Sequence, residues 1–402
     1  MLSRSLNHNS SLTSLRIRWL GLALALTLVV TTGSAWLYTA WQPGYALRWL
    51  ALAAGMSVYL SGILWRYLPD NHRAEEKRLL PYFGAGNNLT LLRGILLVAL
   101  AGFLFSPLPP GGLAWLPGLI YTLAAIADLF DGYLARRSNQ VTQLGEKLDM
   151  SLDGLGVLIA SVLVVQYGQV PAWYLLVGLA RYLFLAGTWL RRRLGKPVYE
   201  LASSSTRRPF AGAQMGLIAV VMWPIFSPPG TSLAATLFAL PFLIGFTRDW
   251  LTVSGALIAG ADRSNLKSDV SGITSSSAAM EPGYWPGRFI ADWAPVILRA
   301  SIIILLAPVL VQRIGGFPAS FWTALANLLA VAGVILLAFG AAGRVAALAV
   351  LFSLGIYQQY SNLTVTDSIA IVAACGLFFL GTGAFSLWTP EKRIINKRIG
   401  EA

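Results

Sequence analysis

The sequence predicts an all-α integral membrane protein that crosses the bilayer many times. Hydrophobic residues make up 56% of the 402 positions and charged residues 12%, a balance typical of polytopic membrane proteins rather than of soluble domains. Long apolar runs recur along the whole chain, and a helix needs roughly 20 such residues to cross the hydrocarbon core. The runs show no strand-like alternation, and backbone groups in lipid must be paired internally, so we expect helices.

About twelve apolar runs are long enough to be transmembrane helices. They lie near 19–41, 46–66, 88–106, 113–135, 148–167, 171–190, 210–227, 232–256, 289–311, 319–341, 344–360 and 367–388. The first run follows Arg16 and Arg18 and has small residues at 33–35, so it could also be a cleaved signal peptide. Because the apolar stretch continues to Trp41, we expect an uncleaved helix instead.

Loop charge predicts the orientation of these helices. Most Lys and Arg residues lie in five segments, 66–86, 136–147, 191–208, 257–288 and 389–402. The alternate turns are nearly free of basic residues, with Arg313 as the exception. Basic loops face the cytoplasm, so this pattern places both termini and all five segments on the cytoplasmic side of the cell (inner) membrane.

The strongly basic composition therefore needs no nucleic-acid partner. The net charge of +13 is explained by basic loops that lie beside anionic lipid headgroups, and membrane lipids are the expected partners. The single cysteine, Cys375, lies in an apolar run and excludes an intramolecular disulfide framework.

Changes in composition divide the chain into four parts. Residues 1–80 form a two-helix extension, and residues 81–257 form a six-helix core. Residues 258–288 are rich in Ser, Gly and Pro and are typical of a flexible cytoplasmic linker. Residues 289–402 form a four-helix membrane domain with a basic tail.

The functional signal is an acidic segment inside the predicted core. The chain has only 17 acidic residues, yet the short stretch 128–153 contains Asp128, Asp131, Glu146, Asp149 and Asp153. On helices, the spacing produces two stripes, because residues three, four, seven and eight apart share a face. The first stripe is Asp128, Asp131, Gly132, Ala135 and Arg136, and the second is Gly145, Asp149 and Asp153. The polar segment 137–144 is long enough for a turn, so four carboxylates can converge across a helix hairpin.

Such a cluster predicts a divalent metal site. Four carboxylates repel one another in a weakly polar environment, and a divalent cation removes that repulsion. Carboxylate oxygens suit Mg²⁺ or Mn²⁺, whereas the two histidines, His8 and His72, lie outside the core. We expect two ions, since a two-metal site stabilises both oxygens of a phosphoryl displacement.

Small and basic residues flank these acids. Gly132, Ala135 and Gly145 leave space for a flat or phosphorylated group, although close packing of helices explains small residues equally well. Arg136 can pair with a phosphate or a carboxylate, or it can mark the cytoplasmic end of its helix.

The segment reads D-x2-D-G-x2-A-R-x8-G-x3-D-x3-D. This pattern resembles the signature of the CDP-alcohol phosphatidyltransferase family, and the resemblance covers about 81–257. It implies that Asp128, Asp131 and Asp149 hold metal and that Asp153 is both a ligand and the general base. It also implies that Gly132, Ala135, Arg136 and Gly145 contact the cytidine nucleotide.

Weaker matches extend the resemblance. The stretch "NNLTLLRG" is similar to the family's Asn-x-x-Thr-x-x-Arg, through Asn87, Thr90 and Arg93. The resemblance implies that Asn87 and Thr90 bind nucleotide. The residues implied to bind the acceptor or its phosphate are Arg93, Lys147, Arg181, Arg207 and Arg208. For Arg181 a structural polar pair, and for Arg207 and Arg208 a membrane-surface role, remain as alternatives.

The function implied is phospholipid biosynthesis. A phosphatidyl group passes from CDP-diacylglycerol to an alcohol, and CMP leaves; a CDP-linked alcohol with a diacylglycerol acceptor uses the same chemistry. The sequence does not identify the alcohol or show whether the enzyme forms a homodimer. Two alternatives use aspartates as cation sites. A prenyltransferase usually has denser acid clusters such as D-D-x-x-D, and a transporter has acids deep in several spans.

The C-terminal region has a second resemblance. The stretches "RFIADWAPVILRASIIILLAP" and "GTGAFSLW" are similar to DoxX-like four-helix membrane proteins. Asp292, Arg299 and Asp367 are charges within or at the edge of its predicted helices. Fold analogy gives no function here, and we favour a packing or partner-binding module.

Overall fold

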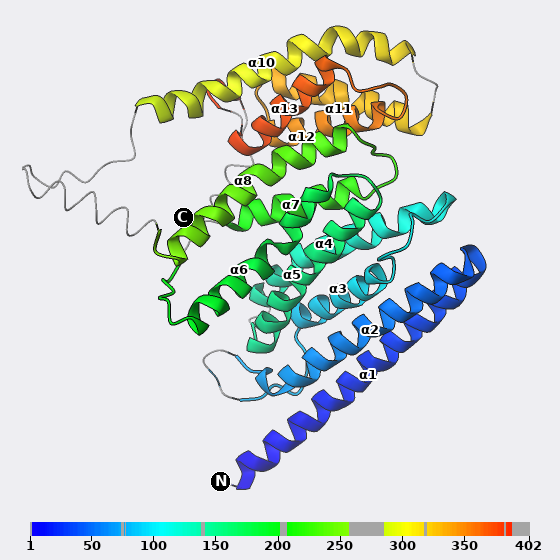
Figure 1. The fold of residues 1–402 in the computed structure, drawn as a ribbon, viewed down its shortest axis with the longest axis vertical. Helices are drawn as coiled ribbons and strands as arrows, with labels where there is room; N and C mark the ends of the chain where they lie inside the picture. Colours follow the sequence, from blue (N-terminus) through cyan, green and yellow to red (C-terminus); the bar gives the residue numbers. More distant parts are fainter. Residues whose placement is uncertain are drawn as a thin grey trace, which may run out of the picture. The chain divides into compact units, whose positions relative to one another are not determined.

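The computed structural model is all-helical in the residues that it describes, which are 2–73, 76, 78–137, 141–201, 207–256, 285–316, 320–381 and 383–387 (Figure 1). These residues form twelve α-helices and three short 3-10 turns. The α-helices are α1 (Leu2–Ala40), α2 (Pro43–Tyr67), α3 (Ala85–Ala101), α4 (Trp115–Arg137), α5 (Gln143–Gln166), α6 (Leu175–Arg193), α7 (Arg207–Val221), α8 (Gly230–Val253), α10 (Trp285–Gly316), α11 (Phe321–Ala338), α12 (Gly343–Tyr357) and α13 (Val365–Leu380).

Each of the twelve predicted apolar runs corresponds to one of these helices, which confirms an all-α multi-pass membrane protein. Eight helices are long and apolar enough to cross a bilayer. The other four, α3, α7, α12 and α13, have shorter apolar stretches of 10–17 residues.

The described helices belong to two compact units, which we treat separately. The first contains residues 1–183 and 212–224, and the second contains 184–211 and 225–402. The boundary runs through α6 and α7, inside the predicted six-helix core. The four-part division predicted from composition remains a prediction, since most of the 258–288 segment lies outside the described residues.

In the first unit, α1 and α2 lie side by side as a hairpin (Figure 1). Pro43 opens α2, where its missing N–H costs no hydrogen bond. The Trp19 indole donates to the carbonyl of Ser61 at 2.9 Å and packs edge-on against Trp65. Helix α3 packs against α2, α4 and α5, and thereby joins this hairpin to the acidic helices.

A polar loop fixes the start of α5. The loop follows the 3-10 turn η1 (Leu68–Asp70), and Asn71 donates its side-chain amide to the carbonyls of Leu80 and Tyr82 at 2.9 and 3.0 Å. The backbone of Gln143 donates to the carbonyl of His72 at 3.0 Å. The N-terminal extension therefore positions the helix that carries two of the aspartates.

In the second unit, α8 packs on α13 through aromatic side chains. The Phe238 ring lies 5.2 and 5.0 Å from the rings of Phe378 and Phe379. Helices α11 and α13 both begin with a capping box, formed by Ser320 with Thr323 and by Thr364 with Asp367.

The structure explains why Arg313 departs from the loop-charge pattern. Its guanidinium is buried and donates to both carboxylate oxygens of Asp367 at 2.8 Å. It therefore forms an internal ion pair and is not a loop charge at the membrane surface. Arg299 is also buried and donates to the carbonyl of Leu337 at 3.0 Å. The side chain of Asp292 lies outside the described residues.

Candidate active site

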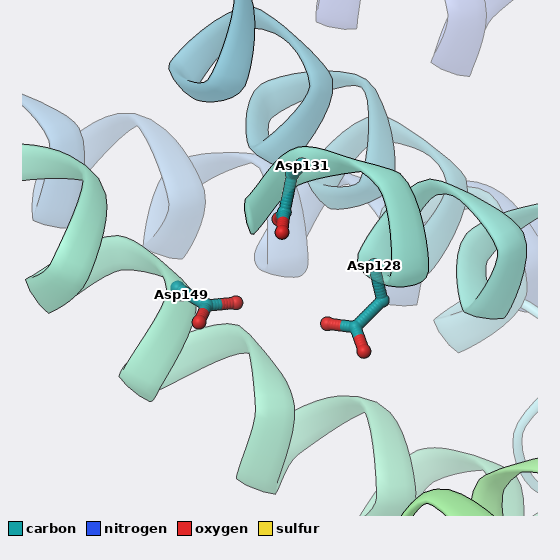
Figure 2. A group of neighbouring side chains, drawn as sticks. All are labelled: Asp128, Asp131 and Asp149. Atoms are coloured by element: carbon teal, nitrogen blue, oxygen red, sulfur yellow. The ribbon is translucent and has the colours of Figure 1, made fainter. Parts of the chain in front are cut away.

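Helices α4 and α5 bring three aspartates together in the first unit. Asp128 and Asp131 project from α4 toward Asp149 on α5 (Figure 2). One carboxylate oxygen from each residue lies within 4.8 Å of the other two. The two helical stripes seen in the sequence thus face each other, as their spacing predicts.

The start of α5 determines which of its residues face α4. Thr142 is the N-cap, and its hydroxyl accepts a hydrogen bond from the backbone of Gly145 at 3.1 Å. Asn87 on α3 donates to the same hydroxyl at 2.9 Å, and to the side-chain oxygen of Asn71 at 3.3 Å. This buried network fixes the rotation of α5, so Asp149 and Asp153 are directed toward α4.

Arg93 of α3 lies in the middle of the acidic cluster. One guanidinium nitrogen, Nη1, donates to Asp128 and to Oδ1 of Asp149, the latter at 2.8 Å. The other, Nη2, donates to Asp153, and Oδ2 of Asp131 lies 3.8 Å from Nη1. The Arg93 side chain is 2% exposed, whereas those of Asp149 and Asp153 are 43% and 41% exposed. The arginine therefore forms the buried floor of the cluster, and the carboxylates form its accessible face.

Thr90 orients one carboxylate from the side. Its hydroxyl is 3.0 Å from Oδ2 of Asp131 and 3.1 Å from the carbonyl of Gly86, one turn earlier in α3. Both Thr90 and Asn87 are buried and hydrogen-bonded to protein atoms. Their predicted contact with nucleotide remains a prediction.

The donor set suits a divalent metal ion. The three mutually close oxygens are hard ligands of the kind that Mg²⁺ and Mn²⁺ prefer. Adjacent ligand oxygens of an octahedral Mg²⁺ are roughly 3 Å apart. Small side-chain rotations would bring the three aspartate oxygens from within 4.8 Å of one another to that distance. Arg93 supplies one positive charge to four carboxylates, and the remaining negative charge favours a cation. The cluster can therefore bind a metal.

Comparison with known proteins agrees with this geometry. The family model for CDP-alcohol phosphatidyltransferase matches residues 84–257. A CDP-diacylglycerol–glycerol-3-phosphate 3-phosphatidyltransferase of Salmonella choleraesuis (strain SC-B67) is 35% identical over 144 residues, which are 34% of this chain and 74% of that protein. The chain belongs to the CDP-alcohol phosphatidyltransferase family.

Other relatives carry the same name. The Escherichia coli (strain K12) protein is 33% identical over 144 residues, which are 34% of this chain and 74% of that protein. The Bacillus subtilis (strain 168) protein is 32% identical over 115 residues, which are 26% of this chain and 60% of that protein. No solved structure matches the chain. The chain is thus a transferase of phospholipid biosynthesis, and the transporter and prenyltransferase alternatives are set aside.

Besides Arg93, two of the predicted phosphate-binding residues of this transferase lie in the first unit. Lys147 on α5 pairs with Asp70 at 2.7 Å and lies over the Tyr67 ring. The side chain of Arg181 on α6 packs against α5 at Gly154, the residue after Asp153. A Cβ built on Gly154 would lie 2.7 Å from Cδ of Arg181. Within the described part of the chain, its guanidinium has no hydrogen-bond or ion-pair partner.

The remaining predicted residues are less informative. Arg207, in the second unit, pairs with Asp249 through two hydrogen bonds of 2.7 and 3.1 Å. Gly132 is half-buried on α4, and Gly145 lies in the first turn of α5 beside Asn87. The side chains of Ala135, Arg136 and Arg208 lie outside the described residues.

Sequence reasoning missed several positioning residues of the transferase. Thr142 has the N-cap signal, a threonine immediately before a helix-forming run, and could have been found. Asp70 and Asn71 belong to the N-terminal extension, and no sequence signal connected them to α5. Arg93 was assigned to acceptor or phosphate, and its position among all four aspartates was not anticipated.

Proposed function

We propose that this enzyme transfers the phosphatidyl group of CDP-diacylglycerol to glycerol 3-phosphate and releases CMP. The observation that carries the proposal is the convergence of Asp128, Asp131 and Asp149 in a member of this family. The relatives named after that reaction supply the donor and the acceptor.

The accessible face of the cluster is the proposed metal site. Asp128, Asp131 and Asp149 would hold Mg²⁺ or Mn²⁺, with Asp153 as a further ligand of a two-ion site. When bound, the ions would neutralise the donor's diphosphate and the charge that develops on its oxygens. Gly132, Ala135, Arg136 and Gly145, with Asn87 and Thr90, form the proposed cytidine side of the site.

Asp153 is the proposed general base. It lies one turn further along α5 than Asp149, its side chain is accessible, and it stands outside the group of three mutually close oxygens. Asp153 accepts the proton of the acceptor hydroxyl, and the new bond forms between that oxygen and the phosphatidyl phosphorus. The bond from phosphorus to the CMP oxygen breaks, and CMP leaves with the electron pair.

Arg181 is the proposed acceptor-phosphate residue. It is half-buried in a membrane-spanning helix, where an unpaired charge is costly and is retained for a function. Its side chain passes over Gly154, the residue that follows Asp153 in α5, and a guanidinium binds phosphate oxygens in a bidentate manner. An acceptor that carries a phosphate would thus be anchored next to the proposed base.

The active site is proposed to face the cytoplasm. Loop charge supports this orientation, and both proposed soluble components, glycerol 3-phosphate and CMP, are water-soluble phosphate compounds.

A CMP-release assay on the purified enzyme tests the proposal. CDP-diacylglycerol is supplied with glycerol 3-phosphate, inositol phosphate, serine or glycerol in separate reactions, and CDP-linked alcohols with diacylglycerol test the reverse roles. We expect release only with CDP-diacylglycerol and glycerol 3-phosphate, and a much larger KM for that acceptor in Arg181→Gln. Release with serine or inositol phosphate instead would refute the proposed acceptor while retaining the reaction class.

A further inference from the structure

Arg93 occupies an unusual position for a buried arginine. It is 2% exposed, and both terminal nitrogens of its guanidinium point at carboxylates of the cluster. Nη1 contacts Asp128 and Asp149, and Nη2 contacts Asp153. The arginine thus holds residues of two helices, α4 and α5, from a third helix, α3.

The same carboxylates are those proposed to hold metal. Asp128 and Asp149 each contribute an oxygen to the group within 4.8 Å, and Asp131 has its own hydrogen bond from Thr90. A carboxylate oxygen that accepts a hydrogen bond from a guanidinium has fewer lone-pair directions left for a cation. A guanidinium and a divalent ion therefore compete for Asp128 and Asp149.

We propose that Arg93 is a built-in counter-cation: it holds the four aspartates together while no ion is bound, and divalent ions must displace it from Asp128 and Asp149. This inference rests on the proposed metal site. Because the side chain is buried, the displaced guanidinium stays beside the cluster, where its positive charge weakens ion binding. Arg93 acts here as a positioning residue that tunes metal affinity.

Direct Mn²⁺ binding to the full-length enzyme tests this inference without an activity readout. The paramagnetic resonance signal of free Mn²⁺ is titrated with wild type, Arg93→Gln, Arg93→Lys and Asp128→Asn. Removal of the charge in Arg93→Gln should tighten Mn²⁺ binding by at least about tenfold. Arg93→Lys keeps the charge and should bind within a few-fold of wild type. Asp128→Asn, which removes a proposed ligand, should bind much more weakly.

Thermal unfolding provides the second readout. In EDTA, Arg93→Gln should unfold at a clearly lower temperature than wild type, and added Mg²⁺ should restore most of the difference, since the ion replaces the lost positive charge. If the unfolding temperature of Arg93→Gln is lowered equally with and without Mg²⁺, Arg93 has a purely structural role and the inference is overturned. An Arg93→Gln protein that cannot be purified even in Mg²⁺ would also overturn it.

The outcomes separate this inference from the proposed function. If wild type binds Mn²⁺ and Asp128→Asn does not, the metal site is supported, and an unchanged affinity in Arg93→Gln then refutes only the counter-cation role. If wild type binds no Mn²⁺, or Asp128→Asn binds it as tightly as wild type, the proposed metal site is wrong and the inference fails with it.

Discussion

Each unit contains a buried arginine that is bonded to one or more carboxylates on other helices, and the two arrangements differ in charge balance. In the second unit, Arg313 and Asp367 form a one-to-one pair. Asp367 also accepts from the backbone and hydroxyl of Thr364 at 3.2 and 2.8 Å. The guanidinium of Arg313 lies 4.8 Å from the centre of the Tyr357 ring. In the first unit, a single arginine faces four carboxylates.

The difference is the one expected between a structural ion pair and a cluster that can bind a cation. The Arg313–Asp367 pair is neutral and buried on both sides, and both oxygens of Asp367 accept hydrogen bonds, so it has no excess charge that would attract another ion. The Arg93 cluster has excess negative charge and an accessible face formed by Asp149 and Asp153. An imbalance of this kind is costly without a ligand, and the cost is consistent with a site that binds a cation.

Removal of divalent ions should have the largest effect on activity, and it should act through the aspartate cluster of the first unit. We expect EDTA to abolish CMP release from CDP-diacylglycerol, because the excess negative charge would then repel the donor's diphosphate. Added Mg²⁺ or Mn²⁺ should restore it. Unchanged release after exhaustive chelation would mean that Arg93 alone compensates the cluster, and that the imbalance has no role in catalysis.

Asp153→Asn should reduce CMP release by about 10²–10⁴-fold, the usual contribution of a general base. The amide oxygen can still accept a hydrogen bond from Nη2 of Arg93, so the cluster should remain assembled and CDP-lipid binding should be largely retained. Binding and turnover are measured side by side.

The matched control for this variant is Asp128→Asn. It removes a proposed metal ligand, so it should weaken binding of the CDP-lipid as well as turnover. Turnover within a few-fold of wild type in Asp153→Asn would assign the base role to another group.

Arg313→Gln should affect stability and leave chemistry unchanged. The variant leaves a buried carboxylate without its partner, which costs about 3–5 kcal/mol in the free energy of unfolding. CMP release per folded molecule should stay within a few-fold of wild type. Unfolding of the detergent-solubilised protein and an assay at low temperature measure the two quantities.

The double variant Arg313→Met/Asp367→Leu sharpens this test. It removes both charges and should be markedly more stable than Arg313→Gln, since no unpaired charge is left buried. A loss of turnover in this stable variant would show that the balanced pair has a functional role.

The sequence predicted the helices and the three converging aspartates because both depend on local spacing. Hydropathy over roughly 20 residues identifies a span, and the i, i+3 and i+4 pattern places Asp128 with Asp131 and Asp149 with Asp153. Contacts between distant segments have no such signal. Arg93 and Asp153 are 60 residues apart, and Arg313 and Asp367 are 54 residues apart.

A motif match also does not reveal the contacts that a side chain makes within the protein. Asn87 and Thr90 match a family motif, yet both are buried and bonded to protein groups. The loop-charge pattern left Arg313 as an exception because it could not detect Asp367 as its partner. Both cases depend on packing between helices that are not adjacent in sequence.

Thr90→Val is expected to have the smallest effect, and it tests how precisely the unbalanced cluster is oriented. Valine has the shape of threonine without the hydroxyl that bonds Oδ2 of Asp131 at 3.0 Å, so packing should be preserved. Loss of a group that orients a metal ligand typically weakens metal affinity by about 10–100-fold. We expect a rise of that size in the Mn²⁺ dissociation constant, with near-normal turnover at saturating metal.

The matched control for Thr90→Val is Thr27→Val on α1. The hydroxyl of Thr27 bonds the carbonyl of Ala23 within its own helix and lies on an exposed face. Its removal should leave Mn²⁺ affinity unchanged, because the bond touches no carboxylate. If Thr90→Val also binds Mn²⁺ like wild type, Asp131 is held by the helix alone. If Thr90→Val binds Mn²⁺ like wild type but its turnover falls, the hydroxyl contacts the nucleotide, as the motif resemblance implies.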